Sequence, residues 1–99
     1  MNFNLIKEKY PKAFALYTEK YGLKYFLCRE LYLFFDEQGI FIEILKMFNG
    51  NYTTPTGFYF YIDDYTRDEY SADTRTLAEE QAFLKAFEIL EDKLWNNSF

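Results

Sequence analysis

Carboxylates that gather behind one predicted strand are the side chains best suited to chemistry. Carboxylate oxygens at the end of a strand and in the loop that follows are the ligands that a divalent cation requires. Their spacing lacks the central glycine and terminal glutamate of a helix–loop–helix calcium site. We therefore expect no metal site and no catalytic residue here, and interpret the cluster as a solvated turn that discourages strand pairing. The cluster consists of Asp63, Asp64, Asp68, Glu69 and Asp73.

Two residue counts limit nucleophilic and metal chemistry. The chain contains no histidine and one cysteine, Cys28. The lack of histidine removes the commonest general base and all histidine-ligated zinc sites. A single cysteine removes disulfide frameworks within the chain and thiolate metal clusters. Cys28 falls beside the apolar stripe of a predicted helix, so we expect a buried thiol. We predict that the chain is not an enzyme and takes no cofactor.

Aromatic side chains are unusually abundant, with 12 Phe, 10 Tyr and one Trp making up 23% of the residues. Rings that stack on single-stranded nucleic acid normally line a basic groove, whereas this chain has a net charge of −5. We therefore expect no direct contact with nucleic acid. Tyrosine and tryptophan are also enriched at the centres of protein interfaces. A protein partner is the better interpretation of the rings that so small a core cannot hide.

Charge is divided along the chain. Residues 1–29 carry six basic and two acidic side chains, whereas residues 30–99 carry five basic and 14 acidic ones. The simpler interpretation is that these parts attract each other within the fold. The alternative is a bipolar surface that orients a charged partner.

The elements that position these side chains follow from hydrophobic spacing and from the prolines and glycines. Proline is tolerated in the first turn of a helix and not in its interior, and glycine commonly follows the last helical residue. A helical spacing gives way to a period of two after Gly39 and returns near Thr76. The predicted elements are a short helical turn before Pro11, a helix from Pro11 to Tyr21, a helix from Lys24 or from as late as Leu27 to Glu37, strands Ile40–Met47 and Phe58–Asp63, and a helix from Leu77 to about Trp95.

The two strands have one face for the last helix and another whose cover is undecided. The first face consists of Ile40, Ile42 and Ile44 with Phe58, Phe60 and Ile62; the second carries Phe41, Leu45, Met47, Tyr59 and Tyr61. The N-terminal helices either cover the second face or leave it as an exposed aromatic patch. Because a two-stranded sheet is marginal alone, a short third strand over Glu69–Ala72 is also considered.

The last helix has the clearest pattern. Thr76 and Glu79 are spaced as a capping box, in which both side chains satisfy backbone N–H groups at the start of the helix. Five residues of this helix and the strands are expected to be largely buried: Phe83, Phe87, Leu90, Ile42 and Phe60.

The whole chain, residues 1–99, is predicted to form one domain of the α+β class, in the order helix, helix, strand, strand, helix, with a small antiparallel hairpin packed against the helices. No stretch reaches the about 18 apolar residues that a transmembrane helix needs. The N-terminus becomes charged too early for a signal peptide. We therefore expect a cytoplasmic protein that does not associate with membranes.

Three stretches of the sequence carry a resemblance: Lys9–Phe14 (KYPKAF), Leu31–Ile40 (LYLFFDEQGI) and Ala78–Glu91 (AEEQAFLKAFEILE). They resemble small phage and prophage proteins of Bacteroidetes hosts, a group that offers no catalytic residues to transfer. The resemblance implies a protein of a mobile element that acts in the cytoplasm of a bacterial host. Small acidic proteins of this kind often bind a host protein, and inhibitors of CRISPR effectors and other defence nucleases are similar in size and composition.

Three functions are open on the sequence alone. The first is a non-enzymatic, anti-CRISPR-like inhibitor that binds a host defence protein. The second is a self-associating structural or accessory phage protein, for which a homodimer is considered. The third is a small-ligand binder or enzyme whose site the sequence does not reveal. For the first function we predict aromatic anchors and a carboxylate rim, formed by Phe41, Tyr59, Tyr61, Asp63 and Asp64.

Overall fold

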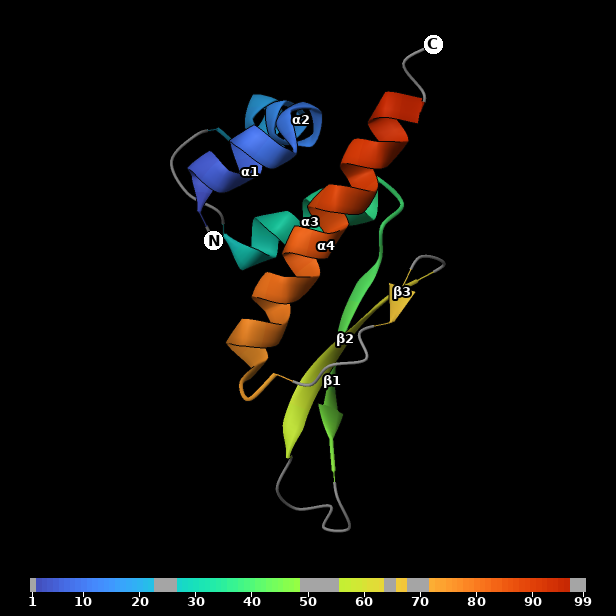
Figure 1. Ribbon diagram of the computed structural model, residues 1–99. Coiled ribbons are helices and arrows are strands. Elements are labelled where there is room, and N and C mark those ends of the chain that lie inside the picture. Colours follow the sequence, from blue (N-terminus) through green and yellow to red (C-terminus); the bar gives the residue numbers. More distant parts are fainter. Residues whose placement is uncertain (1, 23–26, 49–55, 64–65, 68–71, 97–99) are drawn as a thin grey trace.

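The computed structural model describes residues 2–22, 27–48, 56–63, 66–67 and 72–96. It confirms the α+β class, with helices on one face of an antiparallel sheet (Figure 1). The elements are α1 (Phe3–Lys9), α2 (Pro11–Tyr21), α3 (Cys28–Glu37), β1 (Ile42–Met47), β2 (Gly57–Ile62), β3 (Thr66–Arg67) and α4 (Arg75–Asn96).

Proline and glycine set the boundaries of the N-terminal helices as expected. Pro11 occupies the first turn of α2, and the turn predicted before it is the seven-residue helix α1. Gly22 and Gly39 follow α2 and α3 with φ angles of 87° and 77°, which L side chains rarely adopt. The described part of α3 begins at Cys28, so this residue lies at the start of the helix and is exposed. The expectation of a buried thiol was therefore wrong.

The start of α4 differs from the predicted capping box. The hydroxyl of Thr74, and not that of Thr76, accepts a hydrogen bond from the backbone N–H of Leu77 at 3.1 Å. Glu79 instead accepts a hydrogen bond of 3.0 Å from the hydroxyl of Tyr32 on α3. Helix α4 begins at Arg75, so Thr74 is the residue that precedes and caps the helix, and Thr76 lies within its first turn.

The sheet has the order β1-β2-β3 and all pairings are antiparallel. In β1 and β2, Ile44 lies opposite Phe60 and Leu45 opposite Tyr59. The third strand is Thr66–Arg67, upstream of the position considered in the sequence. Of that predicted segment, residues 69–71 lie outside the described residues, and Ala72 forms an isolated bridge with Phe58.

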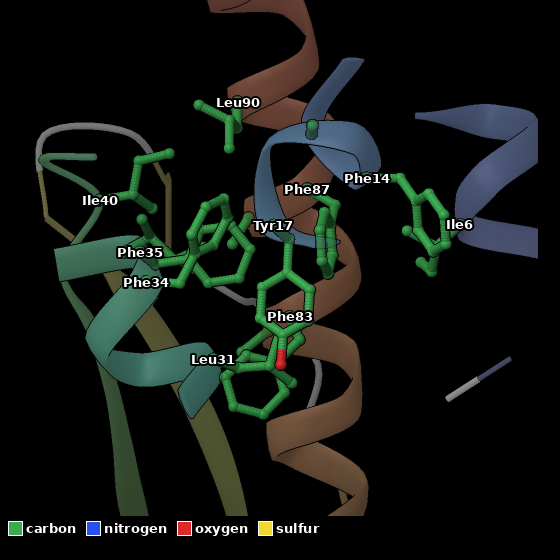
Figure 2. Packing of buried hydrophobic residues seen from close by; sticks show 14 of the residues in the cluster. Ile6, Phe14, Tyr17, Leu31, Phe34, Phe35, Ile40, Phe83, Phe87 and Leu90 are labelled. Atoms are coloured by element: carbon green, nitrogen blue, oxygen red, sulfur yellow. The ribbon is translucent and has the colours of Figure 1, made fainter. Parts of the chain in front are cut away.

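The core consists mainly of rings from α2, α3 and α4 (Figure 2). The rings of Phe35 and Phe87 meet edge to face at 5.0 Å between centroids, and Tyr17 meets Phe34 in the same way at 5.2 Å. Such edge-to-face pairs add to the free energy gained by burial. Four of the five residues predicted to be largely buried are so: Phe60, Phe83, Phe87 and Leu90.

The exception in the predicted core is Ile42, which is only half-buried. It packs against the margin of the core because β1 is the outer strand of the sheet, and α4 lies mainly over β2. The burial of a residue on the core face of the sheet therefore depends on how far its strand lies from the covering helix.

Helix α4 contacts both the sheet and the preceding helices. It packs against β2 and β1 and also against α2 and α3, while α1 packs against α2. The hairpin extends past the N-terminal end of α4, away from α1 and α2 (Figure 1). The molecule is consequently elongated, with extents of 49 × 29 × 21 Å. Among the described helices, none has the length and apolar character needed to cross a membrane.

Candidate protein-binding site

The alternation of side chains along β1 and β2 gives the sheet two different faces. Phe60 and Ile62 on β2 are buried beneath the helices, as predicted. The residues that alternate with these along each strand point to the opposite side, because successive side chains of a strand alternate. We call that side the outer face; its described residues are Phe41, Glu43, Leu45, Met47, Tyr59, Tyr61 and Asp63.

The outer face is apolar at its centre and partly open to solvent. Phe41 is 49% exposed and Met47 39% exposed, while Leu45, Tyr59 and Tyr61 are half-buried. Leu45 lies directly opposite Tyr59, at the separation where cross-strand side chains interact. The register therefore brings the three predicted aromatic anchors onto one surface, together with two apolar residues of β1.

Of the two alternatives left open for this face, cover by the N-terminal helices is not what the structure shows. Helix α2 lies against α4 and α1 packs against α2, at the end of the molecule away from the hairpin (Figure 1). Helix α3 meets β1 and α4, on the side where the core lies. In the part of the chain that the structure describes, all helices thus lie on the inner side of the sheet.

Two carboxylates lie on the outer face, Asp63 at its end and Glu43 between Phe41 and Leu45 along β1. Asp63 is exposed at the end of β2, where its backbone N–H donates a 3.0 Å hydrogen bond to the carbonyl of Phe41. Its carboxylate accepts a long hydrogen bond of 3.5 Å from the hydroxyl of Tyr61. Glu43 is exposed opposite Tyr61. The other predicted rim residue, Asp64, lies outside the described residues.

The acidic cluster of residues 63–73 is described only at its two ends. Asp63 and Asp73 are both exposed, and the remaining three carboxylates lie outside the described residues. Within the described ranges, no three His, Cys, Asp or Glu residues come together as metal ligands would.

Cys28 lies at the start of α3, beside the N-terminal part of α4. Partial burial and, secondarily, the carboxylate of Glu79 raise the pKa of its thiol. Because the thiolate is the nucleophilic form, this environment favours the unreactive thiol.

Glu91 is the one buried charged residue in the described chain, and sequence reasoning missed it. It is 5% exposed, and its carboxylate accepts hydrogen bonds from the backbone N–H groups of Lys12 and Ala13 and from the indole of Trp95. The sequence does hold a signal for this contact, at the start of α2. Helix α2 starts at Pro11 after Tyr10, which offers no side-chain cap, so an acceptor from elsewhere was needed.

Two tyrosine–carboxylate pairs hold α3 in place. The hydroxyl of Tyr17 donates to Glu30 at 3.4 Å, and that of Tyr32 donates to Glu79 at 3.0 Å. Burial and, after it, the neighbouring Glu30 raise the pKa of Tyr17 to about 12. Burial and the hydrogen bond to Glu79 likewise raise the pKa of Tyr32. Both phenols are held in their neutral form, as donors within the fold.

The outer face has to be interpreted from its own residues, because no protein-family model, no curated protein and no solved structure matches the chain. Its described residues combine exposed apolar and aromatic surface with two carboxylates. Such a surface can bury apolar side chains of a partner and pair with basic ones, which is the chemistry of a protein interface.

Proposed function

We propose that this protein is a protein-binding module, and not an enzyme, that docks on a partner protein through the outer face. The observation that carries the proposal is the solvent exposure of Phe41 and Met47 on a sheet face whose opposite side holds the core. An apolar patch that is rimmed by polar groups is typical of interaction sites on small proteins. The predicted anchors Tyr59 and Tyr61 lie on this same face.

The charges on the outer face favour a partner that presents arginine or lysine beside an apolar surface. Glu43 and Asp63 are both exposed there, next to the rings of Tyr61 and Phe41 respectively. Arginine fits this combination better than lysine, because its planar guanidinium stacks on aromatic rings and can bind a carboxylate with two hydrogen bonds.

The biological setting that we propose follows from the resemblance to phage and prophage proteins. The partner is then a host defence protein, such as a CRISPR effector or another defence nuclease, and the module acts as its inhibitor in the cytoplasm of the bacterial host. Defence nucleases carry basic surfaces for their nucleic acids. An acidic module that covers such a surface inhibits without touching nucleic acid itself.

The test is affinity capture from host lysate, followed by mass spectrometry and a binding measurement with the purified partner. Tyr59→Ala should weaken binding by roughly 2 kcal/mol, or about 30-fold in Kd, as hot-spot tyrosines do. The matched control is Leu33→Ala, since Leu33 is 54% exposed on α3, which lies on the inner side of the sheet. Equal binding by wild type and Tyr59→Ala would refute the outer face as the docking site.

The second candidate function is a self-associating accessory protein, and the open position of β1 at the edge of the sheet favours it. The third, a ligand binder or enzyme, is tested by a thermal-shift screen with metal ions and nucleotides, because a ligand that binds only the native state raises Tm. We expect no shift in that screen.

A further inference from the structure

Strand β1 forms one edge of the sheet, and its hydrogen-bonding direction can be assigned. In an antiparallel pair, directly opposed residues either exchange both backbone hydrogen bonds or exchange none, in alternation. The 3.0 Å bond from the N–H of Asp63 to the carbonyl of Phe41 marks the opposed pair Phe41 and Asp63 as bonded. The backbone groups of Ile42, Ile44 and Lys46 therefore point away from β2, toward the open edge.

This edge is ready to accept another strand. Within the described chain, no hydrogen bond from another element reaches the outward backbone groups of β1. The strand has six residues, IEILKM, and contains no proline, glycine or bulge that would block pairing. Its charged residues are one acid and one base, Glu43 and Lys46.

We propose that the edge of β1 pairs with β1 of a second copy of this chain, antiparallel and centred on Ile44. A two-fold axis at Ile44 aligns the outward groups of Ile42 with those of Lys46 in the other copy. Each of these opposed pairs exchanges two backbone hydrogen bonds, giving about six across the interface. The two three-stranded sheets become one continuous sheet in the order β3-β2-β1-β1-β2-β3.

The apolar residues of β1 select this register. Phe41 and Met47 are the exposed apolar residues on the outer side of β1, and each stands three positions from Ile44. The axis at Ile44 places Phe41 of one copy opposite Met47 of the other, twice. Both side chains are thereby covered, and a thioether beside an aromatic ring is a favourable contact. This symmetry exists only in self-pairing, which favours a second copy over an unrelated strand.

The neighbouring antiparallel registers, in which the two-fold axis passes through a residue whose backbone groups point toward β2, are less favourable. An axis at Glu43 places two carboxylates directly opposite each other, which is destabilising. An axis at Leu45 places Glu43 opposite Met47 and takes Phe41 away from its apolar partner. Because Glu43 and Lys46 have opposite charges, the two edges do not repel each other despite the net charge of −5.

The dimer does not depend on the proposed function. It joins the two outer faces into one surface that carries Tyr59 and Tyr61 of both copies. The oligomeric state tests the pairing, whereas the capture experiment above tests what the outer face binds, so the failure of one proposal is distinguishable from the failure of the other.

The first experiment measures the oligomeric state of the full chain by sedimentation, up to roughly 1 mM protein, the weak end of specific association. We expect a monomer–dimer equilibrium. Lys46→Pro should weaken it by about tenfold or more, since the outward N–H of residue 46 is lost and the ring blocks the edge. Lys46→Ala is the matched control, because it removes the same exposed side chain and keeps the N–H. A protein that is monomeric throughout, or a dimer that tolerates Lys46→Pro as well as Lys46→Ala, overturns the proposal.

The second experiment tests the register by disulfide cross-linking in a Cys28→Ser background, because Cys28 is exposed. Opposed residues that do not exchange backbone bonds stand about 4.5 Å apart at Cα, within disulfide range. A mixture of Phe41→Cys and Met47→Cys chains should form a heterodimeric disulfide, and neither variant should cross-link alone. Cross-linking of Leu45→Cys with itself, in place of the mixed pair, overturns the register centred on Ile44.

Discussion

The carboxylate of Glu91 on α4 lies at the N-terminus of α2, where it accepts a 2.8 Å hydrogen bond from the backbone N–H of Ala13. The other carboxylate oxygen accepts bonds from the N–H of Lys12 at 3.3 Å and from the indole of Trp95 at 2.7 Å. The ammonium group of Lys12 also lies 3.8 Å from the centroid of the Trp95 ring. A residue 78 positions away in sequence thus performs the capping that Tyr10 does not.

Replacement of the buried Glu91 should destabilise the fold more than replacement of an exposed carboxylate would. Glu91→Ala leaves buried N–H groups of α2 without an acceptor, and we expect a loss of roughly 1–3 kcal/mol in the free energy of unfolding. Glu91→Gln retains one acceptor oxygen and should fall between Ala and wild type. Urea denaturation measures both. Glu88→Ala, which breaks only the surface pair with Lys85, is the control and should change stability by less than about 1 kcal/mol.

Phe87 is the central ring of the core, and its truncation should leave the fold marginal. It is fully buried and contacts Phe35 and Tyr17 edge to face. Phe87→Ala should cost about 3–5 kcal/mol out of a total stability of about 5–15 kcal/mol. The control is the exposed Leu33→Ala, which should lie within about 0.5 kcal/mol of wild type. Matching denaturation midpoints for Phe87→Ala and wild type would place the core on another face of α4.

The neutral phenol of Tyr17 should make the fold sensitive to alkali. Its pKa is raised from 10.0 to about 12 in the folded protein, so the folded state keeps a proton that the unfolded chain has lost. The Tyr17 phenol makes its full contribution to the free energy of unfolding below about pH 10, and this contribution falls as the pH rises toward about 12. Denaturation midpoints at about pH 8 and about pH 11 measure the loss. Tyr17→Phe should show a smaller decrease, and an equal decrease would assign the alkaline sensitivity to other groups.

The rim carboxylate Asp63 should act on the rate of association with the partner. An exposed charge at the edge of an interface steers the encounter and contributes little to the bound state. Asp63→Asn should therefore slow association and reduce its dependence on salt, with dissociation almost unchanged, in surface plasmon resonance. Asp36→Asn serves as the control, because Asp36 is exposed on α3, away from the outer face. Identical kinetics for the two variants would remove Asp63 from the interface.

Local signals in the sequence predicted most of the fold. Pro11 and Gly39 act through their own backbone geometry, so their effects need no knowledge of the tertiary structure. The period of two in the strands likewise separated the core face, with Phe60, from the outer face, with Tyr59.

The sequence-based predictions failed where a residue distant in the sequence determines the local structure. The burial of Ile42 depends on which strand lies at the edge, and Glu79 accepts a hydrogen bond from Tyr32 on α3 where a capping role was expected. Glu91 could not be assigned because its partners, Lys12 and Ala13, lie at the opposite end of the chain. For the candidate site, the sequence predicted the face and its anchors, but only the packing of the helices revealed which side of the sheet is open.

The position of α4 has a consequence for synthesis of the protein. Both the α1–α2 pair and the hairpin depend on α4, which is synthesised after all of them. Until residues 75–96 have been made, the α1–α2 pair and the hairpin lack the helix against which both pack. Contacts that close across 78 residues also slow folding, because a long loop must be ordered first. The fold should therefore be completed only once α4 has been made, and nascent chains that end before α4 should be held by chaperones.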